Sequence, residues 1–174
     1  MSTPEAGDSE TPQEPLRVTT SRSIAGLYVR LVSAAVVVVG LDQLTKELAL
    51  NSLTRGRSID VIPGILRFRV TYNSGGAFGI FQGSPGVFLL ATIAIVAAIL
   101  LGVRRVEDHR WAIPLGMVLG GGVGNALDRL VRDTGGGVVD FIDLHVWPVF
   151  NVADSAIVLG AALILFLSIR SSDG

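Results

Sequence analysis

The chain has 174 residues, enough for one domain; 49% of them are hydrophobic and only 17% are charged. Soluble domains carry about 25% charged residues, whereas here long apolar blocks raise the mean hydropathy to +0.58. The net charge of −1 provides no basic surface for nucleic acid. With no cysteine and only two histidines, the composition excludes thiol nucleophiles and disulfides and disfavours zinc, so we expect no metal and no cofactor.

Residues 1–22 differ in composition from the rest of the chain. They are rich in Pro, Ser, Thr and Glu and contain few large apolar residues, which predicts a disordered tail. They lack the basic start and apolar core of a secretory signal peptide. We therefore expect one membrane domain over residues 23–170, followed by a short C-terminal tail, 171–174.

Four stretches approach the roughly 20 apolar residues that a membrane-crossing helix needs. They cover residues 24–44, 87–103, 111–127 and 151–169. The sequence therefore predicts an all-α membrane protein with four transmembrane helices. The alternative, buried helices in a soluble protein, is disfavoured because so short a chain has too little polar surface to cover them. In the third stretch Gly116, Gly120 and Gly124 recur every four residues, which predicts close helix packing.

Arginines flank the predicted helices unevenly. They precede the first helix, separate the second from the third and follow the fourth, at positions that include Arg22, Arg104, Arg105 and Arg170. By the positive-inside rule, this pattern favours cytoplasmic N- and C-termini. Four arginines in the loop between the first two helices favour the opposite orientation.

The loop between the first two helices contains a strand pattern. Residues 66–72 alternate apolar and polar side chains, the period of a half-buried strand. Residues 58–62 can pair with them across Pro63 and Gly64, a turn signal. We expect a small antiparallel sheet on the extracytoplasmic membrane surface, with residues 73–79 leading from it towards the second helix.

With four spans, the polar residues at the helix ends and in the connecting loops meet at one membrane face, whichever way the protein is oriented. They are Asp42, Lys46, Asn73, Asn125, Asp128, Arg129, Asp140, Asp143, Asn151 and Asp154. Asp42 and Lys46 have the spacing of a pair on one helix face. An ion pair at the helix end is the simplest role for Asp128 and Arg129, and a hydrogen bond to backbone or a neighbouring loop the simplest for Asn125.

Asp154 and Asp140 form a candidate catalytic pair. Asp154 lies in the first turn of the fourth helix, and an ionisable group inside a span is a functional candidate by default; the alternative is a simple interfacial charge. Asp140 precedes it in the connecting loop, which returns to the same helix. Two carboxyls about 3 Å apart share a proton, so that one activates water and the other polarises a carbonyl. This arrangement predicts aspartic-protease chemistry.

Four motifs in this order resemble the signal peptidase II family, the bacterial lipoprotein signal peptidases. They lie in residues 42–46, in residues 73–79, in residues 124–129, and in the segments around Asp140 and Asp154. The resemblance implies that Asp140 and Asp154 are catalytic, and that Asn73, Asn125, Arg129 and Asn151 line or brace the substrate cleft. It gives Asp42 and Lys46 a supporting role at the end of the first helix, and Asp128 belongs to the third motif.

The resemblance also implies a substrate and a location. The substrate is a prolipoprotein carrying a diacylglyceryl group, cut just before its lipid-modified cysteine, with the lipid chains held between helices in the membrane. We expect a monomer in the bacterial inner membrane with its active site near the extracytoplasmic face. Two alternatives stay open: an ion or proton carrier, which would need acidic groups at mid-membrane depth, and a non-catalytic assembly partner.

Overall fold

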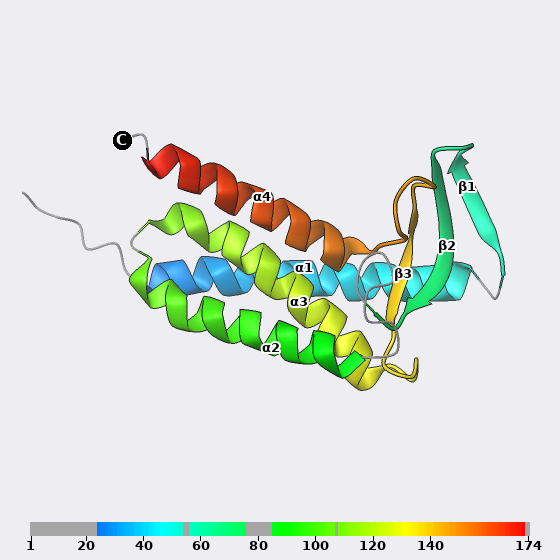
Figure 1. Ribbon diagram of the computed structural model, residues 1–174, viewed down its shortest axis with the longest axis horizontal. Coiled ribbons are helices and arrows are strands. Elements are labelled where there is room, and N and C mark those ends of the chain that lie inside the picture. Colours follow the sequence, from blue (N-terminus) through cyan, green and yellow to red (C-terminus); the bar gives the residue numbers. More distant parts are fainter. Residues whose placement is uncertain (1–23, 54–55, 76–84, 107, 173–174) are drawn as a thin grey trace, which may run out of the picture.

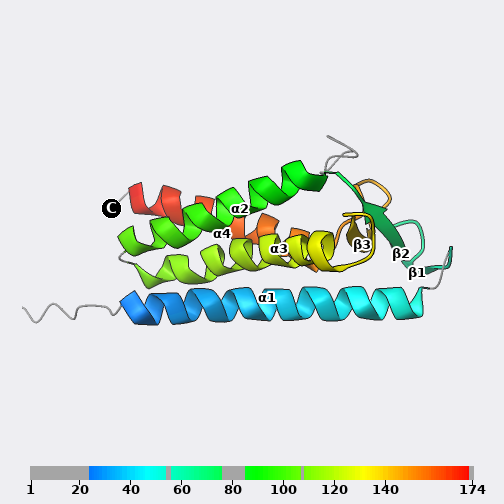
Figure 2. The same ribbon diagram turned by 90° about the horizontal axis from the view of Figure 1, so that it is seen from below.

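The computed structural model describes residues 24–53, 56–75, 85–106 and 108–172, and the predicted N-terminal tail lies outside them. The long elements are α1 (Ile24–Ser52), β1 (Ser58–Ile62), β2 (Leu66–Asn73), α2 (Pro85–Gly102), α3 (Ala112–Val131), β3 (Val138–Asp143) and α4 (Val152–Ser172). Short 3₁₀ turns, Val103–Arg105 and His109–Trp111, join α2 to α3. Figures 1 and 2 show the helices as one bundle with the sheet at one end and the C-terminus at the other.

All four predicted helices are present, but two continue past their predicted ends. Helix α1 runs to Ser52 rather than residue 44, and α3 runs to Val131 rather than residue 127. The predictions stopped where the apolar runs end. The helices continue because polar residues in these extensions, including Lys46 and Asp128, are fully buried and find partners within the bundle.

Helix α3 lies in the middle of the bundle and packs closely on two neighbours (Figure 2). A Cβ atom at Gly120 would lie 2.6 Å from the backbone oxygen of Ala35 in α1. A Cβ at Gly116 would collide with the backbone oxygen of Leu31, and one at Gly121 with that of Ala153 in α4. The predicted close packing is therefore confirmed for α3 and α1, and it extends to α4.

Among the described residues, three helices are long and apolar enough to cross a membrane: α1, α2 and α4. Each turns large apolar side chains outward, such as Val29, Leu90 and Val158, which are 64–68% exposed. Helix α3 is not one of the three, since its glycines, Asn125, Asp128 and Arg129 lower its hydropathy. It is the helix that the other three surround (Figures 1 and 2).

The sheet has three antiparallel strands in the order β1-β2-β3. The predicted hairpin of β1 and β2 is confirmed, with Ser58 opposite Arg69. The placement of Asp140 and Asp143 in a loop is wrong, because residues 138–143 form β3, in which Asp140 lies opposite Thr71 of β2. The β-branched and aromatic residues of this segment suit a strand, and pairing satisfies the backbone groups along the second edge of β2.

A small apolar core attaches the sheet to the bundle. Phe141 of β3 packs with Ala49 and Leu53 near the end of α1 and with Phe68 of β2. The rings of Phe68 and Phe141 are 6.2 Å apart between centroids, a separation typical of favourable aromatic pairs. This contact fixes the strand that carries Asp140 over the ends of the helices.

The packing of α3 on α1 predicts the effect of a single methyl group. Gly120→Ala should lower the free energy of unfolding by about 1–3 kcal/mol, because the new Cβ overlaps the α1 backbone. Gly40→Ala is the matched control: it lies in α1 with no atom within 4 Å of the added Cβ and should be neutral or stabilising. Thermal unfolding in detergent measures both, and equal melting temperatures for the two variants would contradict the packing.

Candidate active site

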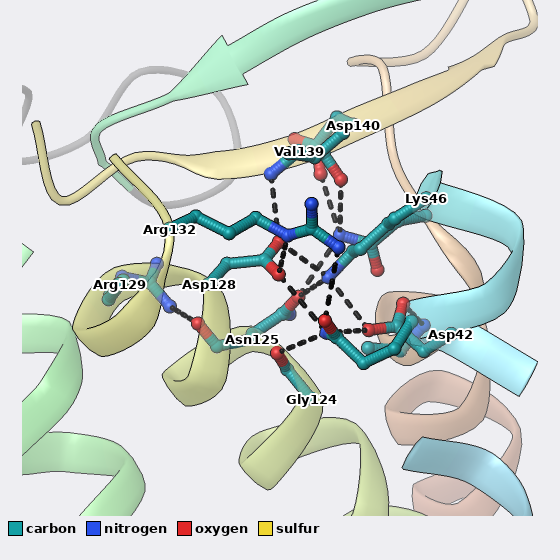
Figure 3. Close-up of polar contacts among 12 residues, drawn as sticks. Asp42, Lys46, Gly124, Asn125, Asp128, Arg129, Arg132, Val139 and Asp140 are labelled. Atoms are coloured by element: carbon teal, nitrogen blue, oxygen red, sulfur yellow. Dashed lines mark hydrogen bonds and ion pairs between the residues drawn. The ribbon is translucent and has the colours of Figure 1, made fainter. Parts of the chain in front are cut away.

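A fully buried lysine lies at the sheet end of the bundle. The Nζ atom of Lys46 is 2.8 Å from a carboxylate oxygen of Asp42 and 2.8 Å from one of Asp128. It also donates a hydrogen bond of 3.1 Å to the side-chain oxygen of Asn125 (Figure 3). The predicted pairing of Asp42 with Lys46 is confirmed, and the contacts of Lys46 with Asp128 and Asn125 join α1 to α3.

Asp128 has different ion partners from the one expected. It pairs with Lys46 and, at 3.0 Å, with Arg132, rather than with the adjacent Arg129. Residues four apart share a helix face, whereas adjacent ones point in different directions. The oxygen of Asp128 that contacts Lys46 also accepts a hydrogen bond of 3.0 Å from the backbone N–H of Val139 in β3, so this carboxylate also contacts the sheet.

Three asparagines hold the two candidate catalytic carboxyls. Asn73 and Asn151 donate to Asp140 at 3.1 and 2.7 Å. Asn125 donates to Asp154 at 2.8 Å, while its own oxygen accepts from Lys46 and from Asn151. These contacts bring together side chains from β2, α3, β3 and the start of α4, and they link the pair to the buried lysine.

The start of α4 orients Asp154. The Asn151 side chain accepts a hydrogen bond of 2.8 Å from the backbone N–H of Asp154, and the Asp154 carboxylate accepts one of 3.2 Å from the backbone N–H of Asn151. This reciprocal pattern is a capping box, which satisfies backbone donors that a helix start leaves unpaired. The same two residues therefore begin the helix and face Asp140.

The environment of Asp140 favours its protonated form. Its side chain is buried, and burial together with the neighbouring charge of Asp154 raises the pKa of Asp140 from 3.8 to about 7. The hydrogen bonds from Asn73 and Asn151, and the charge of Lys46, act in the opposite direction but do not offset the rise. A carboxyl that keeps its proton near neutral pH is suited to donating that proton.

Both carboxyls line a cavity of about 360 Å³. Its charged and amide lining residues are Asn73, Asn125, Arg129, Asp140 and Asp154. Apolar residues of α2 and α4, together with the segment 147–150 that precedes α4, form the remaining wall. The cavity therefore joins charged groups at the sheet end to apolar helix surface.

Arg129 extends into this cavity as a half-buried cation. Its Nη atoms donate to the backbone oxygens of Asn125 and Gly75 at 3.3 and 3.5 Å, and its guanidinium lies 5.5 Å above the ring of Phe88. Its Nε–H is buried and meets no acceptor among the described residues. Such a buried donor can accommodate an acceptor supplied by a ligand.

Nine of the ten polar residues named from the sequence lie in this cluster, with Asp143 as the exception, but two members of the cluster were missed. Gln43 and Arg132 both donate to Asp128, and the i,i+4 spacing of Asp128 and Arg132 was a usable signal. Asp143, which received no role from the sequence, pairs with Arg69 at 2.6 Å. The Arg69 guanidinium holds the pKa of Asp143 below its usual value.

Comparison with known proteins identifies the family of this chain. The family model of signal peptidase (SPase) II matches residues 34–170. The lipoprotein signal peptidase of Mycobacterium leprae is 42% identical over 146 residues, which cover 82% of this chain and 73% of that protein. The lipoprotein signal peptidase of Mycobacterium tuberculosis strain H37Rv is 39% identical over 175 residues, with 99% and 83% covered.

Solved structures agree with the sequence matches. A bacterial membrane enzyme determined by the in meso method at 2.3 Å resolution is 31% identical, has a TM-score of 0.74, and is matched over 82% of this chain and 88% of its own. A second, at 1.9 Å, is 32% identical with a TM-score of 0.71. The family model covers most of the chain, and relatives near 40% identity extend along it. The chain belongs to the signal peptidase II family of peptidases.

Proposed function

We propose that the chain is an aspartyl endopeptidase that removes the signal peptide from diacylglyceryl-modified prolipoproteins, cutting just before the lipid-modified cysteine. The observation that carries the proposal is the convergence of Asp140 and Asp154 on one cavity, each held by asparagine donors. Membership of the signal peptidase II family supports the substrate class.

The chemistry follows from a pair that holds one proton. The ionised carboxylate takes a proton from water as the water oxygen attacks the scissile carbonyl carbon, and the protonated carboxyl gives its proton to the carbonyl oxygen. The tetrahedral gem-diol intermediate then collapses and its C–N bond breaks. The leaving nitrogen takes the proton that one carboxyl received from water, and a hydroxyl group of the intermediate returns its proton to the other carboxylate as the new C=O bond forms. One shared proton remains, so the pair is ready for another cycle.

The other residues in and around the cavity bind the substrate or orient the catalytic pair. The unpaired Nε–H of Arg129 is placed to bind a backbone carbonyl of the substrate. Asn73, Asn125 and Asn151 orient the two carboxyls. The apolar wall formed by α2 and α4 suits the lipid chains or the signal peptide.

The proposal includes an arrangement in the membrane. Residues 23–170 form the peptidase domain, which acts as a monomer with α3 as a fourth span enclosed by α1, α2 and α4. Helix α1 has 29 residues and a length of about 43 Å, more than the roughly 30 Å hydrocarbon core. Both termini are cytoplasmic, and the active site lies near the extracytoplasmic face of the bacterial cell membrane.

A cleavage assay tests the catalytic pair. Asp140→Asn and Asp154→Asn should each abolish cleavage of a diacylglyceryl-modified prolipoprotein, because each removes one proton-transfer group. Asp143→Asn is the matched control: it changes a carboxyl of the same strand that pairs with Arg69 outside the cavity and should retain most activity. A gel shift of the purified protein in detergent, with unmodified prolipoprotein alongside, measures this; cleavage by either of the first two variants would refute the pair.

The pH dependence of cleavage tests the shared proton. Because the pKa of Asp140 is raised to about 7, the pair loses its last proton as the pH rises through that value, and kcat/KM should fall. Asn73→Ala removes a hydrogen bond that lowers this pKa, so the alkaline limb should move to higher pH whatever the residual rate. A limb that stays in place would contradict the assigned contact.

The orientation is testable because the chain has no cysteine of its own. A cysteine at Ile65, in the turn between β1 and β2, should react with a membrane-impermeant maleimide in intact spheroplasts. A cysteine at Ser171, at the other end of the bundle, should react only after permeabilisation. Labelling of Ser171→Cys in intact spheroplasts would show that the protein has the opposite orientation.

A further inference from the structure

Arg132 follows α3 and lies outside the motifs that identify the family. We propose that Arg132 is a positioning residue: it holds the carboxylate of Asp128 in the orientation that fixes β3, and with it Asp140, against the helix ends. This inference rests on the proposed function, in which Asp140 takes part in proton transfer.

The Arg132 guanidinium connects the end of α3 to α1 through three contacts. It donates to Asp128 at 3.0 Å (Figure 3), to Gln43 at 3.2 Å and to Glu47 at 3.3 Å. Gln43 in turn donates to the same oxygen of Asp128 at 3.1 Å. Arg132, Gln43 and Asp128 therefore form a closed ring of hydrogen bonds in which each side chain restricts the other two.

The charges explain why this position requires a cation. Asp42 and Asp128 are both fully buried, and both lie 2.8 Å from the single ammonium of Lys46. Arg132, whose side chain is 19% exposed, supplies the second cation by pairing with Asp128. Without it, two buried carboxylates would share one lysine, and an uncompensated buried charge is strongly destabilising.

Asp128 transmits this arrangement to the catalytic strand. The oxygen of Asp128 that contacts Lys46 also accepts the hydrogen bond from the backbone N–H of Val139. Val139 is fully buried and directly precedes Asp140. Strand β2 holds β3 along the other side, where Thr71 lies opposite Asp140. The position of Asp140 thus depends on the orientation of the Asp128 carboxylate.

Steady-state cleavage kinetics on the full chain in detergent test the proposal. Arg132→Met should lower kcat about 10–100-fold, as expected for the loss of a charge-assisted hydrogen bond, and leave KM nearly unchanged because Arg132 does not line the cavity. Arg132→Lys, which keeps the charge, should restore most of kcat. Glu47→Gln is the matched control; it alters only the exposed partner of Arg132 and should resemble the wild type.

A double-variant cycle tests whether Arg132 acts through Asp128. Arg132→Met combined with Asp128→Asn should be no slower than Asp128→Asn alone, because the contact is already lost. If Arg132→Met is too unstable to assay, the double variant carries the test, since it removes one charge of each sign. Additive losses, or a wild-type kcat in Arg132→Met, would overturn the proposal.

Hydrogen exchange gives a readout that does not depend on activity. The Val139 amide should exchange faster in Arg132→Met than in the wild type or in Glu47→Gln, as measured by mass spectrometry of peptides containing β3. Unchanged exchange would overturn the inference even if cleavage is impaired. If the wild type fails to cleave lipidated prolipoprotein, the proposed function fails, while the exchange experiment still tests Arg132.

Discussion

The structure depends on one buried charge, the Lys46 ammonium. Removing an ammonium from water costs several kcal/mol even after relaxation, so it is tolerated only with close partners. Asp42, Asp128 and Asn125 provide them. Through Asn125 the lysine is linked to Asp154, and through Asp128 to the strand that carries Asp140. One side chain of α1 is therefore connected, through Asn125 and Asp128, to both carboxyls of the candidate site.

The small residues of α3 make room for this cluster as well as for helix packing. Gly120 and Gly116 let α3 approach the backbone of α1. One turn further on, a Cβ at Gly124 would lie 2.7 Å from the carboxylate of Asp42. The four-residue glycine spacing thus changes its role along the helix. At its first two positions it allows backbone contact, and at the third it leaves space for a charged side chain that pairs with Lys46.

The balance of buried charge agrees with a pair that holds one proton. Four carboxyls and three cations in the described part of the chain make up the cluster: Asp42, Asp128, Asp140 and Asp154 with Lys46, Arg129 and Arg132. With one proton on the Asp140 and Asp154 pair, the charges cancel. Burial and the charge of Asp154 raise the pKa of Asp140, which keeps that proton bound near neutral pH.

The sequence by itself determined the elements with local periodicity: the four helices, the β1–β2 hairpin, the close packing of α3, and the residues that would meet at one end of the bundle. Only the tertiary structure decided that residues 138–143 are a strand, that α1 continues to Ser52, and that Gln43 and Arg132 complete the cluster. The physical reason is the range of the interactions. Hydropathy and side-chain period can be read from a single segment of the sequence. In contrast, β3 is stabilised by β2 and by Asp128, and the polar end of α1 is stabilised by partners on α3 and α4. These groups become neighbours only when the chain is folded.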